Sequence, residues 1–317
     1  INSIGITGSN GKTILKEWLY QCLSNEFVTV KSPKSFNSQI GLPLSLFQIE
    51  KKHDLGIFEV GISKPDEMDN QENIFHPKIG LLTHIGSAHS ANFSSEEELI
   101  NEKLKLFKNS EIIFYNADNL LTDKIINELY SSKKLISYGL EISNDIHIIS
   151  DVNDRTQDIQ IKYFDEIIKL PIFQRDEATL TNVLALIGIL KELKISNSDI
   201  KEKIDALKAI EMRLESIEGI RNNLIINDSY NLDLDSLKIA FQFIGEYNKP
   251  KKSLILTDIL DSNENSQELY SEVSELVNEQ NFDKVFLIGD EISNFHELFT
   301  SETFTFNNTN QFIDSKV

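Results

Sequence analysis

A strand, a glycine-containing loop and a helix follow one another in the first 23 residues of the chain. Residues 3–7 read SIGIT, a run that is typical of a buried strand, and residues 13–23 carry apolar side chains at a helical period. The loop TGSNGKT joins them. Backbone N–H groups at the start of such a helix point toward the loop, and the helix dipole favours an anion there. This order restricts the chain to an α/β fold with a phosphate site after its first strand.

The loop departs from the common phosphate-binding pattern in the position of one glycine. That pattern has a glycine five positions before its second glycine, but this chain has Ile6 there and places a glycine only three positions before. A chance GKT is the alternative, although the preceding TG and the following helix favour a nucleotide site. We expect the Thr13 hydroxyl to bind Mg²⁺ and the phosphates to be bound by Gly8, Ser9, Asn10, Gly11 and Lys12.

Apolar strands alternate with helical segments along most of the chain, which indicates a mostly parallel sheet with helices on both faces. Residues 145–172 alternate apolar and polar side chains instead, as antiparallel strands do. A second run of strands and helices begins at residue 212, and a length of 317 residues also suggests two domains. We predict an α/β domain over residues 1–211 and a smaller α/β domain over residues 212–317, which we expect to be incomplete.

Composition argues against several classes of partner and location. The chain has 50 acidic and 31 basic residues, and its net charge of −19 repels the phosphates of nucleic acids. A single cysteine, Cys22, permits no internal disulfide, which fits a reducing compartment. There is no run of about 18 apolar residues that would cross a membrane. We therefore expect a cytoplasmic protein that has no membrane span and binds no nucleic acid.

Seven further motifs follow the loop in a fixed order. Together with the shortened TGxxGKT loop they resemble the Mur ligase family, the ATP-dependent amide-forming enzymes of peptidoglycan assembly and their folylpolyglutamate synthase relatives. The motifs span about 230 residues, an extent that is hard to obtain by chance. They are FNSQIGLP (36–43), FEVGISKPDEM (58–68), THIGSAH (83–89), NEKLKLF (101–107), YNADN (115–119), MRLE (212–215) and INDSYNLD (226–233).

The resemblance implies a P-loop ATPase-like central domain followed by a smaller Rossmann-like domain. The segment DSYNLDLDSLKIA is most similar to the branch of the family that adds D-alanyl-D-alanine to UDP-N-acetylmuramoyl-tripeptide. It is especially similar to a subgroup in which that ligase is fused to an alanine racemase. The racemase and the family's N-terminal UDP-sugar domain have no counterpart in this chain, so we expect the native protein to carry further, covalently fused domains.

The family's metal-binding residues have counterparts in three of the motifs. Glu59 ends a buried strand, where a lone carboxylate needs a cation or a donor, and the resemblance makes it a Mg²⁺ ligand. It likewise assigns His89 to a second Mg²⁺ ion. Lys103 matches the lysine that CO₂ converts to a carbamate ligand, although Lys105 is a second candidate in the same motif. A capped glutamate, a structural histidine and a solvated helix lysine are the alternatives.

Four residues correspond to nucleotide contacts in the family. Asn182 matches an asparagine that contacts adenine, with a helix N-cap as an almost equally good interpretation. Arg213 corresponds to an arginine that reaches the phosphates, and Asp228 and Asn231 lie near the ribose and base. The resemblance assigns catalytic roles to Lys12, Lys103, His89 and Arg213.

Three interpretations of function remain open on the sequence. The first is a ligase that uses ATP and Mg²⁺ to add D-alanyl-D-alanine to UDP-N-acetylmuramoyl-tripeptide through an acyl phosphate. The second is another Mur-type or folylpolyglutamate-type amino acid ligase. The third is a catalytically silent nucleotide-binding region beside a racemase, which the complete set of loop and metal-binding residues disfavours.

Overall fold

The computed structural model describes residues 1–86, 92–172, 174–247, 249–260 and 265–315. The chain forms two compact units, residues 1–227 and 228–317. The domain boundary predicted near residue 211 stays a prediction. Within the part of the chain that the structure describes, no helix is both long enough and apolar enough to cross a membrane.

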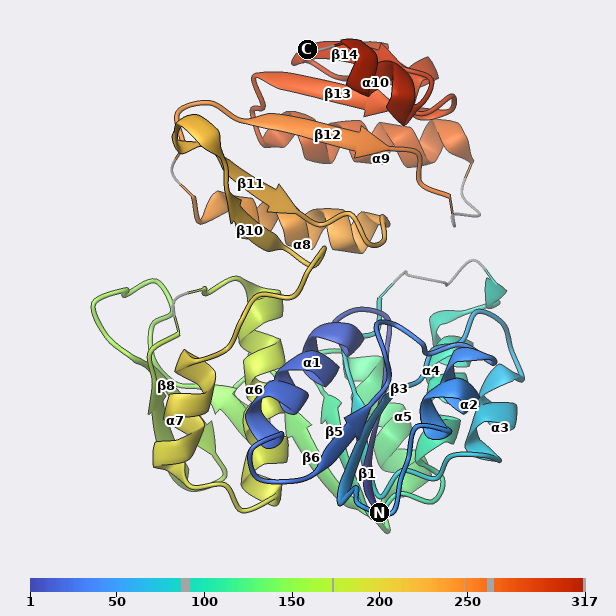
Figure 1. Ribbon diagram of the computed structural model, residues 1–317, viewed down its shortest axis with the longest axis vertical. Helices are drawn as coiled ribbons and strands as arrows, with labels where there is room; N and C mark the ends of the chain where they lie inside the picture. Colours follow the sequence, from blue (N-terminus) through green and yellow to red (C-terminus); the bar gives the residue numbers. More distant parts are fainter. Residues whose placement is uncertain (87–91, 173, 248, 261–264, 316–317) are drawn as a thin grey trace. The chain divides into compact units, whose positions relative to one another are not determined.

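A nine-stranded sheet forms the centre of unit 1 (Figure 1), in the order β2-β3-β1-β4-β5-β6-β7-β8-β9. Neighbouring strands from β2 to β7 run parallel, and the last two pairings are antiparallel, so both predictions about strand direction are confirmed. The strands are β1 (Asn2–Thr7), β2 (Thr29–Lys31), β3 (Leu55–Glu59), β4 (Ile79–Leu82), β5 (Ile112–Asn116), β6 (Lys134–Tyr138), β7 (Ile146–Ile148), β8 (Ile159–Tyr163) and β9 (Glu166–Leu170).

Helices cover both faces of this sheet, because side chains along each strand point alternately to one face and the other. In β5, Phe114 packs into a core with α1, α6 and α7, whereas Ile113 and Tyr115 pack into a second core with α2 to α5. The helices are α1 (Lys12–Leu23), α2 (Gly41–Leu46), α3 (Glu67–Glu72), α4 (Glu96–Leu104), α5 (Leu120–Tyr130), α6 (Glu177–Glu192) and α7 (Asn197–Asp205), with a 3₁₀ turn at Lys105–Phe107.

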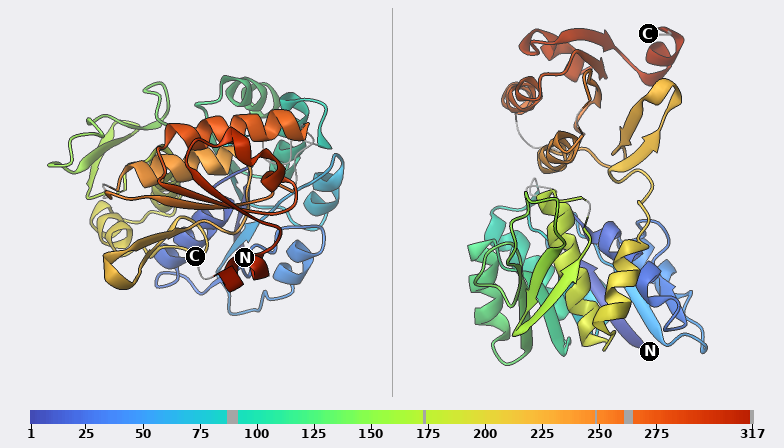
Figure 2. Two further views of the ribbon diagram at one scale, coloured as in Figure 1. Left: turned by 90° about the horizontal axis from the view of Figure 1, so that it is seen from above. Right: turned by 90° about the vertical axis from the view of Figure 1, so that its left-hand side faces the viewer.

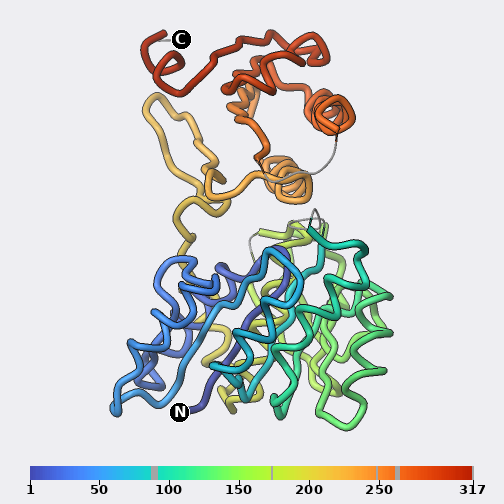
Figure 3. Tube along the Cα trace, turned by 90° about the vertical axis from the view of Figure 1, so that its right-hand side faces the viewer, coloured from blue at the N-terminus to red at the C-terminus, as the bar shows by residue number. Residues whose placement is uncertain are grey.

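The strand order changes direction at β1. From this strand the chain goes first to β2 and β3 on one side and then to β4, β5 and β6 on the other. Figure 3 traces β1 from the N-terminus into the interior of unit 1. In open α/β sheets ligands bind beyond the carboxyl ends of the strands at such a switch point. The topology therefore puts the loop after β1 at the favoured ligand position of unit 1.

Unit 1 ends in an antiparallel pair, and unit 2 is a smaller α/β layer structure. The pair consists of β10 (Glu215–Glu218) and β11 (Leu224–Asn227), with a 3₁₀ turn at Ile220–Asn222 between them. Unit 2 has a parallel sheet in the order β12-β13-β14, with α9 and α10 on opposite sides of β13 (Figure 2). Its elements are α8 (Leu234–Gly245), β12 (Ser253–Thr257), α9 (Ser266–Glu279), β13 (Lys284–Ile288), the 3₁₀ helix Ile292–Leu298, β14 (Glu302–Phe306) and α10 (Thr309–Ser315).

Candidate active site

The loop after β1 is held by the residues that directly follow β4. Ser9 N donates to His84 O at 2.8 Å, and Thr83 Oγ1 donates to Asn10 O at 2.6 Å. Gly8 has a φ of +144°, and a Cβ there would lie 2.0 Å from Thr83 Oγ1. Only glycine fits this position, because a side chain would meet both an unfavourable backbone conformation and a hard contact. The glycine of the shortened motif is thus required by the close approach of Thr83, the residue that directly follows β4.

Helix α1 begins directly at the loop and has no side-chain cap. Its N-cap residue is Gly11, with a φ of +87°, so the first backbone N–H groups of the helix are not satisfied by a capping side chain. The ammonium of Lys12 folds back over the loop and donates to Gly8 O at 2.8 Å and to Ser9 O at 2.7 Å. An uncapped helix N-terminus beside an ammonium group is suited to bind phosphate.

Thr13 and Glu59 form a pair beside the loop. Thr13 Oγ1 donates to Glu59 Oε2 at 2.9 Å, and Glu59, the last residue of β3, is 1% exposed. Asn37 Nδ2 donates to the other carboxylate oxygen of Glu59 at 2.7 Å. Ser35 Oγ lies 3.2 Å from Thr13 Oγ1. A buried carboxylate and a hydroxyl are therefore held together at the start of α1, and their predicted role as Mg²⁺ ligands stays a prediction.

Two buried polar atoms at the loop have no hydrogen-bond partner among the residues that the structure describes. They are Thr7 Oγ1, at the end of β1, and Asn10 Nδ2, within the loop. Buried polar groups in proteins are nearly always paired with protein, water or ligand atoms. A hydroxyl and an amide without partners next to the phosphate loop are consistent with a site that a polar ligand completes.

Lys103 enters the site from α4. Its side chain is 1% exposed, and its Nζ donates to Gly8 O at 3.0 Å, the same carbonyl that Lys12 contacts. Burial, together with the positive charge of Lys12, lowers the pKa of Lys103 well below its ordinary value of 10.5. Lys105, by contrast, forms ion pairs with Asp69 and Glu102, both at 2.7 Å. Of the two lysines in the NEKLKLF motif, Lys103 is the one at the loop.

The adenine-contact candidate Asn182 also lies next to the loop. It belongs to the interior of α6, whose N-cap is Asp176, so the interpretation of Asn182 as an N-cap is wrong. A Cβ on Gly11 would lie 2.7 Å from Asn182 Oδ1, which puts this amide against the start of α1. His89 lies outside the residues that the structure describes. Its predicted role on a second Mg²⁺ ion stays a prediction.

The remaining candidates fall in different units. Arg213 lies in unit 1, between Met212 and Leu214, which both have positive φ angles, and its backbone N donates to Ile210 O at 3.1 Å. Asp228 and Asn231 lie in unit 2, where Asn231 Nδ2 donates to Asp233 Oδ2 at 3.1 Å. Their predicted convergence on one nucleotide stays a prediction.

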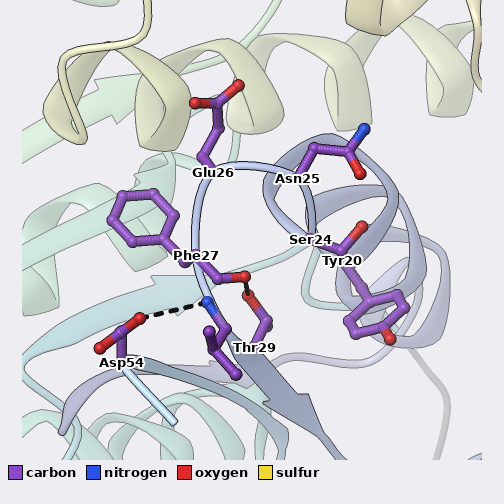
Figure 4. A pocket seen from close by; sticks show the side chains of 8 residues that line it. Tyr20, Ser24, Asn25, Glu26, Phe27, Thr29 and Asp54 are labelled. Carbon is purple, nitrogen blue, oxygen red and sulfur yellow. Dashed lines mark hydrogen bonds between the residues drawn. The ribbon is translucent and has the colours of Figure 1, made fainter. Parts of the chain in front are cut away.

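A separate open pocket of about 390 Å³ lies at the far end of α1 from the loop (Figure 4). The 12 residues of α1 separate the two places by about 18 Å at 1.5 Å per residue. The pocket is lined by Tyr20, Ser24, Asn25, Glu26, Phe27, Val28, Thr29 and Asp54, none of which belongs to a motif quoted above. The candidate active site is therefore the loop and its surroundings.

A known domain family matches the part of the chain that contains the loop and the residues around it. Residues 6–190 match the Mur ligase middle domain. The chain belongs to the Mur ligase family. The matched range contains the loop, Glu59, Lys103 and Asn182, so the family that the motifs predict is confirmed.

Two relatives of this chain share one function. It is 28% identical over 292 residues to the UDP-N-acetylmuramoyl-tripeptide–D-alanyl-D-alanine ligase of Bacillus subtilis, and 31% identical over 294 residues to that of Borreliella burgdorferi. The alignments cover 90% and 91% of this chain and 62% of each relative. The Mur ligase chain thus spans about three fifths of the length of these two relatives.

Solved structures share the fold of this Mur ligase. MurF from Acinetobacter baumannii superposes with a TM-score of 0.84 and 22% identity, covering 99% of this chain and 69% of the other. The MurF ligase from Thermotoga maritima in complex with ADP gives a TM-score of 0.81 and 23% identity, covering 99% and 72%. The predicted mostly parallel α/β architecture is confirmed by these neighbours as well as by the strand order.

The structure adds residues whose roles the motifs alone did not indicate. Asn37 stands in the motif FNSQIGLP, and it orients Glu59. Ser32 Oγ accepts from Glu59 N at 3.1 Å, and Ser35 contacts Thr13. Polar residues in this motif and directly before it were the available signal, but only the folded chain brings them to a carboxylate 22 to 27 positions away.

Proposed function

We propose that this Mur ligase is part of an enzyme that uses ATP to join D-alanyl-D-alanine to UDP-N-acetylmuramoyl-tripeptide. The observation that carries the proposal is the convergence of Lys12 and Lys103 on the carbonyl of Gly8, beside the Thr13–Glu59 pair. The function of the similar ligases from Bacillus subtilis and Borreliella burgdorferi supports this substrate pair. The fusion to an alanine racemase stays a prediction.

The loop would hold the phosphates of ATP. The N–H groups at the start of α1 would donate hydrogen bonds to these phosphates. The Lys12 ammonium, which donates to the carbonyls of Gly8 and Ser9 in this structure, lies in the loop that the phosphates would occupy. Asn182, against Gly11, is positioned to contact the nucleotide from α6. We assign the remaining nucleotide contacts to Arg213, Asp228 and Asn231 by their place in the family motifs.

The residues beside the loop suit Mg²⁺. The Thr13 hydroxyl and the Glu59 carboxylate supply oxygen atoms 2.9 Å apart, and oxygen is the ligand atom that Mg²⁺ prefers. Among the described residues no group of three or more His, Cys, Asp or Glu side chains could hold a metal ion. This agrees with Mg²⁺ binding, because the ion commonly takes one or two protein carboxylates and completes its shell with phosphate oxygens and water. When bound, Mg²⁺ offsets the negative charge of the phosphates.

Lys103 would supply a further metal ligand as a carbamate. Its lowered pKa favours the neutral amine, whose nitrogen can attack the carbon of CO₂ to form an N–C bond and release a proton. The product is a carboxylate on the lysine, which puts an anion next to the Lys12 ammonium. The carbamate would attract the Lys12 ammonium, whereas a protonated Lys103 would repel it, and it would add oxygen atoms beside the loop. With His89, it would complete the ligands of two Mg²⁺ ions.

The reaction would then proceed in two steps. The terminal carboxylate of the tripeptide attacks the γ-phosphorus of ATP, ADP leaves, and an acyl phosphate forms. The amine of D-alanyl-D-alanine attacks the acyl carbon, inorganic phosphate leaves, and the amide bond is made with loss of a proton. Lys12 would stabilise the charge that builds up on the transferred phosphoryl group, which is the main requirement of such transfers.

Phosphate release tests the proposal. The whole protein that contains these 317 residues is assayed with ATP, Mg²⁺ and UDP-N-acetylmuramoyl-tripeptide, with and without D-alanyl-D-alanine. We expect release that depends on the dipeptide. Release that responds instead to single amino acids would assign the enzyme to another branch of the family, and no release with any acceptor would indicate a silent nucleotide-binding region.

The carbamate is tested separately. Lys103→Ala is expected to lose ligase activity, and added short carboxylates such as formate or acetate are expected to restore part of it by occupying the vacated position. Lys105→Ala provides the matched control, because Lys105 lies in the same motif but pairs with Asp69 and Glu102. Full activity of the Lys103→Ala variant would contradict the carbamate.

A further inference from the structure

Helix α1 carries a completely buried lysine one turn after the phosphate loop. Lys16 is 0% exposed, although a lysine is almost never fully buried unless it is paired. Its Nζ forms an ion pair with Glu17 Oε1 at 3.0 Å and donates to the backbone carbonyl of Lys34. Burial lowers the pKa of Lys16, while the nearby carboxylates of Glu59 and Glu17 act to raise it. None of the roles assigned above uses this residue.

The carbonyl that Lys16 holds belongs to a strained turn. Lys34 has a φ of +46°, in the left-handed region that a residue with a long side chain rarely adopts. Such a conformation is unfavourable for a residue with a side chain and persists only where its surroundings enforce it. The hydrogen bond from Lys16 is a tether of this kind, because it fixes the carbonyl of the strained residue to α1.

The turn at Lys34 lies within a short segment, residues 32–37, that surrounds the Thr13–Glu59 pair. On one side of the turn, Ser32 Oγ accepts from Glu59 N at 3.1 Å. On the other side, Ser35 Oγ lies 3.2 Å from Thr13 Oγ1. Asn37 then donates to Glu59 Oε1 at 2.7 Å and accepts from Gly61 N at 2.7 Å. The tether is therefore at the centre of the segment that orients both side chains of the pair.

We infer that Lys16 is a positioning residue for the magnesium–nucleotide site. By holding Lys34 O, it fixes the segment 32–37, and this segment in turn holds Thr13 and Glu59 in the arrangement that would receive the ion. The inference rests on the proposed function in so far as that pair is taken as the magnesium site. Substitution of a residue that orients metal ligands typically lowers metal affinity 10- to 100-fold.

Lys16→Met tests the inference by removing the ammonium while keeping most of the side-chain volume. ADP binding to the chain is measured by calorimetry with and without Mg²⁺, so that the ratio of the two dissociation constants reports the magnesium contribution alone. We expect this ratio to fall by about 10-fold or more, as for other residues that orient metal ligands. Binding without Mg²⁺ should change by less than about twofold, because the loop backbone and Lys12 are untouched.

Lys31→Met is the matched control. Lys31 pairs with the same glutamate, Glu17, but it does not contact Lys34 O and is partly exposed. This variant should keep the wild-type dependence on Mg²⁺. Lys16→Arg, which retains a donor, should recover part of the magnesium contribution that Lys16→Met loses.

A double-mutant cycle shows whether Lys16 acts through the segment. Ser35→Ala removes the contact with Thr13, and its effect should not add to that of Lys16→Met if both report the same positioning. Full additivity, or equal loss of binding with and without Mg²⁺, would overturn the inference. If Lys16→Met does not fold, Ser35→Ala and Asn37→Ala decide the matter, because wild-type magnesium dependence in both would show that the segment does not position the pair.

The nucleotide-binding measurement is independent of the ligase assay. Loss of the magnesium contribution in Lys16→Met would support the inference even if phosphate release showed no dependence on D-alanyl-D-alanine. Failure of wild-type chain to bind ADP more tightly with Mg²⁺ would instead contradict the assignment of the site itself. The two results can therefore be told apart.

Discussion

Replacing Lys103 by Met should make unit 1 more stable at neutral pH, even though the lysine is assigned a central role. The ammonium is buried beside Lys12, and among the described residues its hydrogen-bond partner is the carbonyl of Gly8, with no carboxylate in contact. Burying a cation in this position lowers the free energy of unfolding, because burial disfavours the charged form. Methionine has a similar shape and carries no charge, so the substitution removes that cost.

The magnitude follows from the shifted pKa. Between the lowered pKa of folded Lys103 and its ordinary value of 10.5, the unfolded chain binds more protons than the folded chain. The free energy of unfolding of the wild type therefore rises by about 1.4 kcal/mol per pH unit in this interval from this group alone. Methionine lacks this dependence but loses the hydrogen bond to Gly8 O, a loss of about 1 kcal/mol. Because one pKa unit corresponds to about 1.4 kcal/mol, a pKa that is lowered by about one unit already makes the gain from removing the ammonium as large as the loss of this hydrogen bond.

The expected result is a difference that changes sign with pH. At pH 7 Lys103→Met should be the more stable protein, its advantage should shrink as the pH rises, and near pH 10.5 the wild type should be more stable by about 1 kcal/mol. Urea unfolding is followed through the fluorescence of Trp18, the only tryptophan of the chain, which packs against the core of unit 1. Buffers free of CO₂ keep the wild-type amine unmodified.

Lys105→Met is the control for this measurement. Although partial burial acts to lower the pKa of Lys105, hydrogen bonds with Asp69 and Glu102 raise it overall. A raised pKa means that the stabilisation is fully present below pH 10.5, so this variant should be destabilised by a constant amount of about 1 kcal/mol between pH 7 and 10, the size expected for a partly exposed ion pair. The reasoning would be refuted if Lys103→Met behaved in the same way, with a pH-independent loss.

Three further substitutions and one control substitution test other parts of the structure. Gly8→Ala should lower the free energy of unfolding by about 2–4 kcal/mol through the contact with Thr83 and the positive φ. Gly245→Ala, which has open space around it, should have no such cost in the same urea titrations. Glu59→Gln should reduce the magnesium contribution to ADP binding by about 10-fold or more while leaving binding without Mg²⁺ nearly intact, and calorimetry showing an unchanged ratio would contradict its assignment. Ser95→Ala should cost about 1 kcal/mol in thermal or urea unfolding, because Ser95 Oγ caps α4 by accepting from Glu98 N at 3.1 Å, and an unchanged midpoint would refute the cap.

Local patterns were enough to predict the architecture of unit 1 and most of the loop. The β-branched run before TGSNGKT and the helical period after it are properties of neighbouring residues, and β1 and α1 form where those patterns predict. The same local reasoning narrows the N-cap of α4 to Ser94 or Ser95, since serine before an acidic first turn satisfies nearby N–H groups, and the structure shows that Ser95 is the cap. Asn182 was harder, because a short polar side chain suits a cap as well as a ligand contact, and only the position of Asp176 at the start of α6 excludes the cap.

The sequence by itself determined the family, the α/β layers and the residues of the loop, because periodicity, glycine spacing and ordered motifs are all written along the chain. Only the tertiary structure decided which side chains meet. It brings Lys103 from α4 to the carbonyl of Gly8, 95 positions earlier, and leaves Lys105 in ion pairs with Asp69 and Glu102. It also buries Lys16 under a strained turn. Such pairings depend on how strands and helices pack in space, and no local pattern records the distance between residues that are far apart in the chain.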